Sequence, residues 1–404
     1  MKLIKSFILP LLCVFLLSSC SMDETVGKII PMQEKPPVLL SDEVIAPAVS
    51  RFAFNNLNDD EKQTYREICT AILNQDEKIK LTTLDKDTVE KPFQAVFSDH
   101  PEIFYIDGYQ IKSFGTENAV SYIQFFPSYT QNADEISWRK EKIDSVASGI
   151  VGQAQGLGDD YQKAKFVYEY VIKNTDYSAD APDSQNVYSV FNNHKSVCAG
   201  YARSVQLLLN RLGIECTYVI GSDLENNSHA WNFVKLDGEY YHMDATFGDP
   251  VFSNGKIAEG FTETDEGEPS TEEVANIPNV FYEPFAMTDE VALKSRIISE
   301  GQNLPPATAT ADSYYVREGN FFETYSTELL LPCLERALEN KQNYVTFQMA
   351  NDEGYQTALR ALFVEMDMTT MVDTCQKDGY FMVNKESVTY FKNDETRTLT
   401  IMLY

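Results

Sequence analysis

The sequence is poor in positive charge and in cysteine, and each shortage argues against a class of protein. Its 404 residues include 33 Lys and Arg against 61 Asp and Glu, which gives a formal net charge of −28. Such a chain repels nucleic acids and anionic lipid surfaces at long range, which argues against binding either of them as its main role. None of the seven cysteines forms a tight Cys-x-x-Cys pair, which argues against a zinc ribbon or a thioredoxin-type redox site.

One long apolar run is present, and it lies at the N-terminus. Residues 1–19 carry Lys2 and Lys5, then an apolar stretch, then Leu-Ser-Ser directly before Cys20. A short basic segment, a short apolar core and small residues before a cut are typical of an export signal rather than of a membrane-spanning helix. The ending resembles the lipobox of bacterial lipoproteins, so we expect a lipoprotein signal peptide over 1–19; an ordinary secretory signal is the alternative.

This resemblance implies that Cys20 is diacylated and becomes the new N-terminus. The protein would then be exported and lipid-anchored to a bacterial membrane, on its periplasmic side or at the cell surface, with no spanning helix in the mature chain. Five cysteines would remain in the mature protein: Cys69, Cys198, Cys216, Cys333 and Cys375. Because five thiols cannot all pair within one chain, at least one stays free in a compartment that can oxidise thiols.

Composition divides the mature chain into a tether and three predicted domains. Residues 20–50 are polar and contain four prolines, which indicates a tether that holds the body away from the membrane. Residues 51–155 combine helical spacing after Asn58 with two strand-like stretches and a helix over roughly 135–150. They predict a small α+β domain, which we interpret as packing support for the domain that follows.

A second domain is predicted over 156–300 and a third over 301–404. Within the second, the segment 259–273 contains seven carboxylates and indicates a solvated loop, with a flap over a nearby site as the weaker alternative. The third alternates helix and strand signals, which predicts a small α/β or α+β domain. No internal repeat is evident.

The stretch SVCAGYARSVQLLLNRLG, which begins at Ser196, places Cys198 where a helix is expected to start. A nucleophilic thiol needs a lowered pKa, a base within reach and a group that orients the base. Unpaired N–H groups at a helix start carry positive partial charge, which favours a thiolate. Ala199 and Gly200 are expected to keep the first turn free of bulk for an acyl substrate. A small core cysteine is the alternative interpretation.

A predicted hairpin further along the chain supplies the other two groups. Asp237-Gly238 lies between two alternating apolar runs, a strong signal for a two-residue turn. This register pairs Trp231 with Asp244 and makes His229 and Asp244 diagonal neighbours on one face, roughly 7–8 Å apart. A hydrogen bond between them would orient the imidazole and leave its other nitrogen for Cys198.

These residues carry a family resemblance. Three segments, each on its own predicted element, resemble the core of the transglutaminase-like superfamily in exported bacterial proteins: Cys198-Ala199-Gly200-Tyr201-Ala202, His229-Ala230-Trp231-Asn232 and Tyr241-His242-Met243-Asp244-Ala245-Thr246. The resemblance covers about 159–250. It implies an α+β, papain-like fold in which a helix carrying the cysteine packs on an antiparallel sheet carrying histidine and aspartate, flanked by smaller α+β domains. It also implies Cys198 as nucleophile, His229 as base and acid, and Asp244 as the orienting group.

One position departs from the family pattern. Better-known members follow the nucleophilic cysteine with tryptophan, where this chain has Ala199, so an oxyanion donor from that ring is absent. The backbone N–H of Cys198 and a second donor would then hold the oxyanion. Gln185 is the candidate by analogy with papain-like enzymes, and an ordinary loop amide is the alternative. Trp231 and Asn232 are expected to wall the site, with core packing as the alternative for Trp231.

The resemblance implies peptide or protein amides as the class of substrate, with cell-wall peptide as one option. It implies no cofactor. Water would complete the reaction as in a cysteine peptidase or amidase, and an amine would complete it as in a transglutaminase. Two alternatives stay open. One is a catalytically silent binding or scaffold protein at the cell surface. The other is a metal site made of Cys198, His229, His242 and Asp244, which lacks the local ligand spacing usual for zinc, so no metal is expected.

Overall fold

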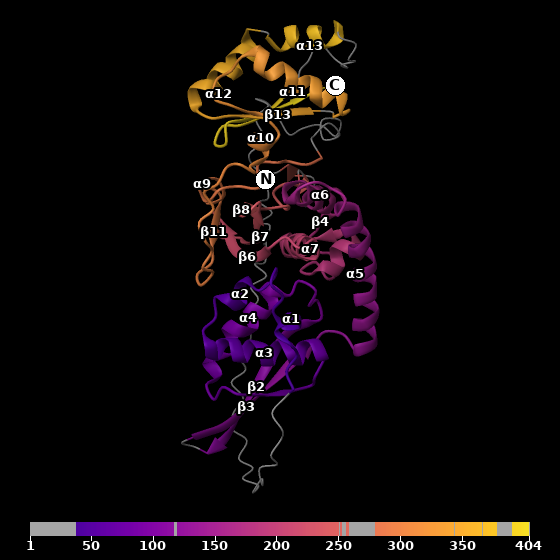
Figure 1. The fold of residues 1–404 in the computed structure, drawn as a ribbon, viewed down its shortest axis with the longest axis vertical. Coiled ribbons are helices and arrows are strands. Elements are labelled where there is room, and N and C mark those ends of the chain that lie inside the picture. The colour runs from indigo at the N-terminus through magenta and orange to yellow at the C-terminus, as the bar shows by residue number, and fades with distance from the viewer. Residues whose placement is uncertain are drawn as a thin grey trace, which may run out of the picture.

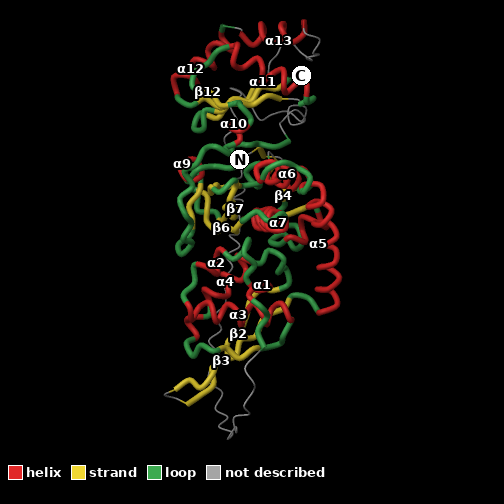
Figure 2. The backbone as a smooth tube through the Cα atoms, viewed as in Figure 1, coloured by secondary structure: helices red, strands yellow, loops and turns green. Residues whose placement is uncertain are grey.

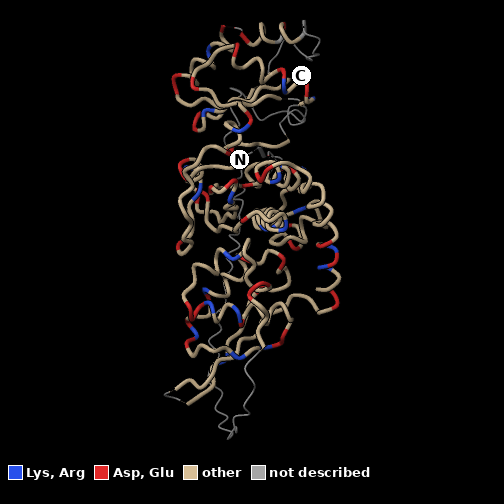
Figure 3. Tube along the Cα trace, in the orientation of Figure 1, with Lys and Arg blue, Asp and Glu red and all other residues tan. Residues whose placement is uncertain are grey.

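The three largest sheets of the described residues follow one another along the long axis of the molecule (Figure 1), and two further sheets have two strands each, β4-β5 and β10-β9. The computed structural model describes residues 38–116, 119–249, 251–252, 256–257, 279–342, 344–365, 367–377 and 390–403. The predicted signal peptide, the lipidation residue Cys20 and the acidic segment 259–273 lie outside the described residues. Lys and Arg occur along the whole length among the more numerous Asp and Glu (Figure 3).

The first sheet belongs to the N-terminal part. Its order is β1-β3-β2 and both pairings are antiparallel. Helix α3 starts with a capping box, in which Asn58 and Glu61 each accept a hydrogen bond from the other's backbone N–H. The elements are α3 (Asp59–Asn74), β1 (Ile79–Leu81), η1 (Lys86–Thr88), α4 (Glu90–Asp99), β2 (Ile106–Thr116) and β3 (Ala119–Tyr129).

Two short helices precede α3, namely α1 (Asp42–Ile45) and α2 (Phe52–Asn55). The first lies within the predicted tether, yet Ile45 is fully buried in the hydrophobic core. Ile45 and Ala46 therefore anchor this segment on the N-terminal part, whereas Val38 and Val44 are exposed.

Helix α5 (Ala133–Ala154) connects the first sheet to the second, and Figure 1 shows it running along one side of the molecule between them. The sequence predicted this helix over roughly 135–150. It is capped by Asn132, whose side chain accepts from Glu135 N–H.

The second sheet has the order β11-β6-β7-β8 and is antiparallel throughout. Helix α7 packs against β7 and β6. The elements of this part are α6 (Asp160–Lys173), β4 (Asp176–Tyr177), η2 (Ser189–Asn193), β5 (Lys195–Ser196), α7 (Cys198–Arg211), β6 (Cys216–Asp223), β7 (Ser228–Leu236), β8 (Glu239–Met243), β9 (Val251–Phe252), β10 (Lys256–Ile257), α9 (Asp289–Ala292) and β11 (Arg296–Ile298).

The hairpin prediction is confirmed next to its turn. Asp237 and Gly238 have φ values of 47° and 96°, as a two-residue turn with two left-handed positions requires. The pairs run from Leu236 with Glu239 to Asn232 with Met243, in the predicted register.

The third sheet belongs to the C-terminal part and has the order β12-β13-β15-β14. Figure 2 shows α11, α12 and α13 on one side of that sheet and the short α10 on the other. The elements are α10 (Tyr314–Arg317), β12 (Phe321–Phe322), α11 (Thr327–Glu339), β13 (Tyr344–Met349), α12 (Asp352–Leu359), η3 (Arg360–Val364), α13 (Asp367–Lys377), β14 (Tyr390–Asn393) and β15 (Thr398–Met402). None of the helices in the described ranges is long and apolar enough to cross a bilayer.

The buried apolar side chains form two main clusters. The larger one runs through the N-terminal and middle parts, from Ile45 to Tyr315. The second belongs to the C-terminal part and includes Leu334, Phe347 and Ile401. The predicted α+β class is confirmed, and the shared first cluster agrees with packing support of the middle part by the N-terminal part. The domain boundaries at 155 and 300 stay predictions.

Candidate active site

Cys198 is the first residue of α7, and its side chain is partly exposed. The preceding residue, Val197, has extended backbone angles and no side-chain group that could cap the helix. The positive end of the helix dipole therefore lies at this thiol. Among the cysteines that the structure describes, none forms a disulfide with this sulfur.

Gly200 has a different role from the one predicted. A Cβ at this position would lie 1.9 Å from Ser196 Oγ and 2.9 Å from the Ser184 carbonyl oxygen. Ser196 Oγ donates to that carbonyl at 2.8 Å, and Val197 N–H donates to it at 3.2 Å. The space beside Gly200 is thus filled by the preceding loop. The glycine serves close packing of loop on helix and does not leave room for a substrate on that side.

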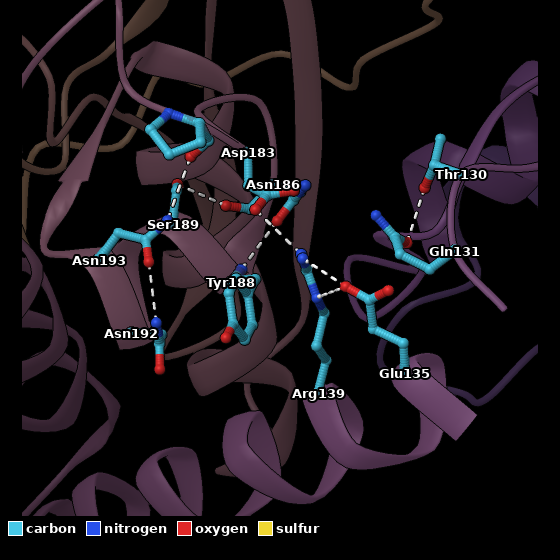
Figure 4. A network of polar contacts seen from close by, with 11 residues as sticks. Thr130, Gln131, Glu135, Arg139, Asp183, Asn186, Tyr188, Ser189, Asn192 and Asn193 are labelled. Carbon is cyan, nitrogen blue, oxygen red and sulfur yellow. Dashed lines mark hydrogen bonds and ion pairs between the residues drawn. The ribbon is translucent and has the colours of Figure 1, made fainter. Parts of the chain in front are cut away.

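Gln185 lies in the same loop, directly after Ser184, and its side chain is exposed. The loop is held from α5, where Arg139 Nη1 donates to Asp183 Oδ2 at 2.9 Å (Figure 4). On the other side of Gln185, Tyr188 N–H donates to the side chain of Asn186 at 2.9 Å. These contacts fix the loop on both sides of Gln185 beside the start of α7. Its role as an oxyanion donor stays a prediction.

His229 and Asp244 are joined by a short hydrogen bond. His229 Nε2 lies 2.7 Å from Asp244 Oδ2, and the exposed fractions of the two residues are 9% and 0%. Cys198 lies close enough to the imidazole to raise the pKa of His229. Because Nε2 is taken by the carboxylate, Nδ1 is the ring nitrogen that remains for the thiol.

The predicted register does not extend to Asp244. Strand pairing stops at Asn232 with Met243, so the predicted pair of Trp231 with Asp244 does not form. Asp244 N–H instead donates to the carbonyl of Pro284 at 2.9 Å. Its Oδ1 accepts from the N–H groups of Thr246 and Phe247, both at 3.1 Å. These bonds turn the chain away from β7, so the carboxylate reaches His229 from a turn and not from a strand.

The charges of this pair are set by burial and by neighbouring groups. Burial alone would lower the pKa of His229, but Asp244 and Cys198 outweigh that effect and raise the pKa to about 9. Burial would raise the pKa of Asp244, yet His229 and Arg296 outweigh it and hold that pKa well below its usual range. At neutral pH, His229 is therefore protonated and Asp244 is ionised.

Arg296 was not identified from the sequence. Its Nε donates to Asp244 Oδ2 at 2.8 Å, its Nη2 lies 2.8 Å from the same oxygen, and the residue is only 4% exposed. It lies on β11, far along the chain from the recognised motifs, so no local pattern indicates it. Its pairing with β6 brings it to the site.

Tyr177 on β4 is a second residue that sequence reasoning missed. Burial raises the pKa of its phenol, and the nearby charges of Cys198 and Asp244 raise it further. The hydroxyl of Tyr177 is therefore neutral and lies close enough to Cys198 and Asp244 to feel their charges. A tyrosine in a polar loop carries no signal in the sequence that would mark it as part of a site.

Trp231 lies behind His229. Its ring is fully buried and stacks on the imidazole, with centroids 5.7 Å apart and planes inclined by 20°. The indole N–H donates to His242 Nδ1 at 3.0 Å, so His242 presents its Nε2–H to Asp289 Oδ1, 2.9 Å away. Trp231 thus walls the site on its interior side, and this placement combines the wall with the core packing considered as the alternative.

Asn232 points to the opposite face of β7. Its Nδ2 donates to the backbone carbonyl of Ala202 at 2.9 Å, and the residue is fully buried. Asn232 therefore ties α7 to the sheet. It does not line a surface that a substrate could reach, which corrects the expectation that it walls the site.

The metal alternative needs His242 beside the other three side chains. Both ring nitrogens of His242 are occupied by Trp231 and Asp289, and burial lowers its pKa, so it is neutral. In the part of the chain that the structure describes, no group of three or more His, Cys, Asp or Glu side chains could hold a metal ion.

A family model described as the transglutaminase-like superfamily matches residues 147–245. The matched segment includes Cys198, His229 and Asp244. The chain therefore contains the transglutaminase-like core that its motifs predicted, within an α+β fold. The match also supports a thiol enzyme in general terms.

Three solved structures are similar to part of this chain. A transglutaminase structure is 14% identical (TM-score 0.24) over 41% of this chain and 47% of its own. A protein from Cytophaga hutchinsonii described as a candidate cysteine protease is 16% identical (TM-score 0.24) over 37% and 65%. The periplasmic domain of TgpA from Pseudomonas aeruginosa is 15% identical (TM-score 0.23) over 32% and 55%. This chain thus spans between about half and two thirds of their lengths, and at these TM-scores the likeness carries no further argument. No curated protein sequence matches the chain significantly.

Proposed function

We propose that this protein is a transglutaminase-like thiol enzyme that cleaves peptide or protein amides, or transfers their acyl group, through Cys198, His229 and Asp244. The observation that carries the proposal is the hydrogen bond between Asp244 and His229, with a partly exposed thiol at the start of α7 near enough to the imidazole to raise its pKa. A buried, protonated imidazole beside such a thiol is the arrangement that a thiolate nucleophile requires.

In the first half-reaction, Cys198 Sγ attacks the carbonyl carbon of the amide. The backbone N–H of Cys198 and a second donor, with Gln185 as the candidate, donate hydrogen bonds to the carbonyl oxygen, on which negative charge develops. His229 gives its proton to the departing amine, the C–N bond breaks, and a thioester remains on the enzyme.

In the second half-reaction, neutral His229 takes a proton from water or from a second amine as that molecule attacks the thioester. The C–S bond breaks, the thiolate returns, and His229 is again protonated. Water yields a carboxylic acid, and an amine yields a new amide. Asp244 keeps its hydrogen bond to Nε2 throughout, and the stacked ring of Trp231 restricts rotation of the imidazole.

The proposed place of action is outside the cytoplasm. The lipobox-like sequence before Cys20 supports an exported protein that is anchored by lipid, with peptides or proteins of the cell envelope, cell-wall peptide included, within its reach. Cys20→Ser should then abolish incorporation of a labelled fatty acid into the protein, and incorporation that survives in this variant would contradict the anchor.

A quenched peptide-library screen tests the proposed activity. Wild-type protein and Cys198→Ala are compared, with and without an added primary amine, and the products are weighed by mass spectrometry. Gain of water identifies hydrolysis, and gain of the amine identifies transfer. Turnover that survives in Cys198→Ala contradicts the proposal. Absence of turnover, together with a thiol whose reactivity does not depend on His229, would favour a binding or scaffold role.

A further inference from the structure

Arg296 is a buried cation next to a buried anion. It lies beyond residue 245, where the family match ends, and it is only 4% exposed. Burying two opposite charges is costly unless their geometry is good and their remaining hydrogen-bonding groups are satisfied. Both conditions hold here, because Nε and Nη2 pair with Oδ2 of Asp244 and Nη1 donates to Ser295 Oγ at 2.8 Å.

The pairing of β11 with β6 places the side chain of Arg296 beside Asp244. Strand β11 pairs with β6 so that Arg296 lies opposite Asp223 and Ile298 lies opposite Gly221. A Cβ on Gly221 would lie 2.1 Å from the carbonyl oxygen of Ile297 and 2.7 Å from the ring of Trp231. Glycine at 221 therefore allows the edge strand to approach while Trp231 stays stacked behind His229.

Phe247 fixes the guanidinium from a third side. The guanidinium carbon of Arg296 lies 4.6 Å from the centre of the Phe247 ring. The same ring meets His229 edge to face, with centroids 4.8 Å apart and planes inclined by 88°. Arg296, Phe247 and His229 thus pack in sequence around the carboxylate of Asp244, and each restricts the position of the next.

We infer that Arg296 is a positioning residue of this site. It anchors Oδ2 of Asp244 toward His229, so that the guanidinium and the imidazolium both interact with the same carboxylate. Oδ1 is already held by two backbone N–H groups, so Arg296 is what fixes the remaining oxygen. Only the catalytic consequence of this inference rests on the proposed function; the effect on His229 does not.

Removing the positive charge of Arg296 is expected to shift the pKa of His229 in one direction. Without the guanidinium, one positive neighbour of His229 is gone, so the imidazolium becomes easier to keep and the pKa of His229 rises. The carboxylate also loses two donors, but its Oδ1 keeps the backbone N–H groups of Thr246 and Phe247, so it stays beside the ring in a less precise position and the loss of charge decides the sign. Other ionisable groups near this pair are the same in wild type and variant: Cys198 on α7, Tyr168 on α6, Tyr177 on β4 and His242 on β8.

The test uses Arg296→Met and Arg296→Lys in the full-length protein. The pKa of His229 is measured by NMR in a Cys198→Ala background, which needs no substrate. We expect Arg296→Met to raise it by about one unit and Arg296→Lys to leave it near the wild-type value. An unchanged pKa in Arg296→Met overturns the inference about charge, whether or not the wild-type protein turns over any amide.

Steady-state kinetics of variants that keep the native Cys198 test whether Arg296 anchors the carboxylate of Asp244. Arg296→Met should lower kcat/KM roughly 100-fold, mostly through kcat, because a misplaced imidazole acts on the chemical step. Arg296→Lys keeps the charge with one donor group, so it should lose less activity than Arg296→Met and keep the wild-type pH profile. Full kcat in Arg296→Lys overturns the anchoring role, and this variant remains informative if Arg296→Met does not fold. Arg317→Met is the matched control, because Arg317 pairs with Asp159 and Asp312 away from the site and should leave the pKa of His229 unchanged.

Discussion

The N-terminal part of the molecule contains a second group of thiol, imidazole and carboxylate. Cys69 Sγ lies 3.3 Å from His100 Nε2, and His100 Nδ1 lies 2.7 Å from Glu102 Oε1. The residue types, and their order along the chain, match those of the proposed active site. The two groups can therefore be compared to see what a thiol needs besides the right neighbours.

They differ in access and in the use of the imidazole. Cys69 lies inside α3 and is fully buried, whereas Cys198 is partly exposed at a helix start. His100 Nε2 lies 2.8 Å from the carbonyl oxygen of Ile45, and a carbonyl only accepts hydrogen bonds. This nitrogen therefore carries a proton that is used to hold α1. Burial would lower the pKa of His100, but Cys69 and Glu102 outweigh it and raise it well above its usual value. The group around His100 is therefore structural, because its imidazole proton binds the carbonyl of Ile45.

The largest expected difference between the two groups is in the loss of the thiol. Cys198→Ala should reduce amide turnover by a factor of about 10⁴ or more, because the nucleophile is gone. Cys69→Ala should leave turnover unchanged and cost about 1 kcal/mol of unfolding free energy through a small cavity. Steady-state kinetics and urea denaturation of both variants give the comparison. A loss of turnover in Cys69→Ala with the fold intact would remove the distinction.

The carboxylates should differ almost as much. Asp244→Asn replaces an acceptor with an amide that can present N–H to His229, which reverses the tautomer, so kcat should fall by about 10²–10⁴. Glu102→Gln should leave kcat unchanged, since His100 takes no part in the reaction. Equal effects of the two substitutions on kcat would contradict the assignment of roles.

The pH dependence of stability gives a smaller effect. The pKa of His229 is raised from 6.5 to about 9, so its contribution to stability is fully present below pH 6.5 and is lost as pH rises through 9. The contribution amounts to about 3 kcal/mol, by the free energy that corresponds to one pKa unit. His229→Gln should therefore be less stable than wild type at pH 6, with a smaller difference at pH 10, in urea denaturation. A difference that stays constant between these pH values argues against a charged His229. His100→Gln should show the same sign, because its pKa is also raised.

Local sequence signals predicted the parts of the site that depend on short-range structure. Asp237-Gly238 set a turn and, with it, the register of β7 and β8 as far as Asn232 and Met243. The motifs around Cys198 predicted the transglutaminase-like core, which the family match confirms. Both signals work because the residues that interact are close in sequence or belong to a fixed pattern.

The rest of the site depends on contacts that no local pattern carries. Asp244 leaves the strand because its own side chain accepts two backbone N–H groups, which outweighs the alternating pattern before it. Arg296 reaches Asp244 only through pairing of β11 with β6. Gly200 accommodates serines of the preceding loop, a contact that is set by how that loop folds. Tertiary packing decides all three.

The proposed activity depends most on activation of Cys198 by His229. The direct measurement is the rate at which iodoacetamide alkylates Cys198 at pH 7, followed by mass spectrometry in folded wild type and His229→Gln, with His100→Gln as the matched control. We expect rapid, selective labelling of Cys198 in wild type and His100→Gln, and labelling at least about tenfold slower in His229→Gln, because the imidazolium that stabilises the thiolate is missing. Equal rates in wild type and His229→Gln would contradict the account.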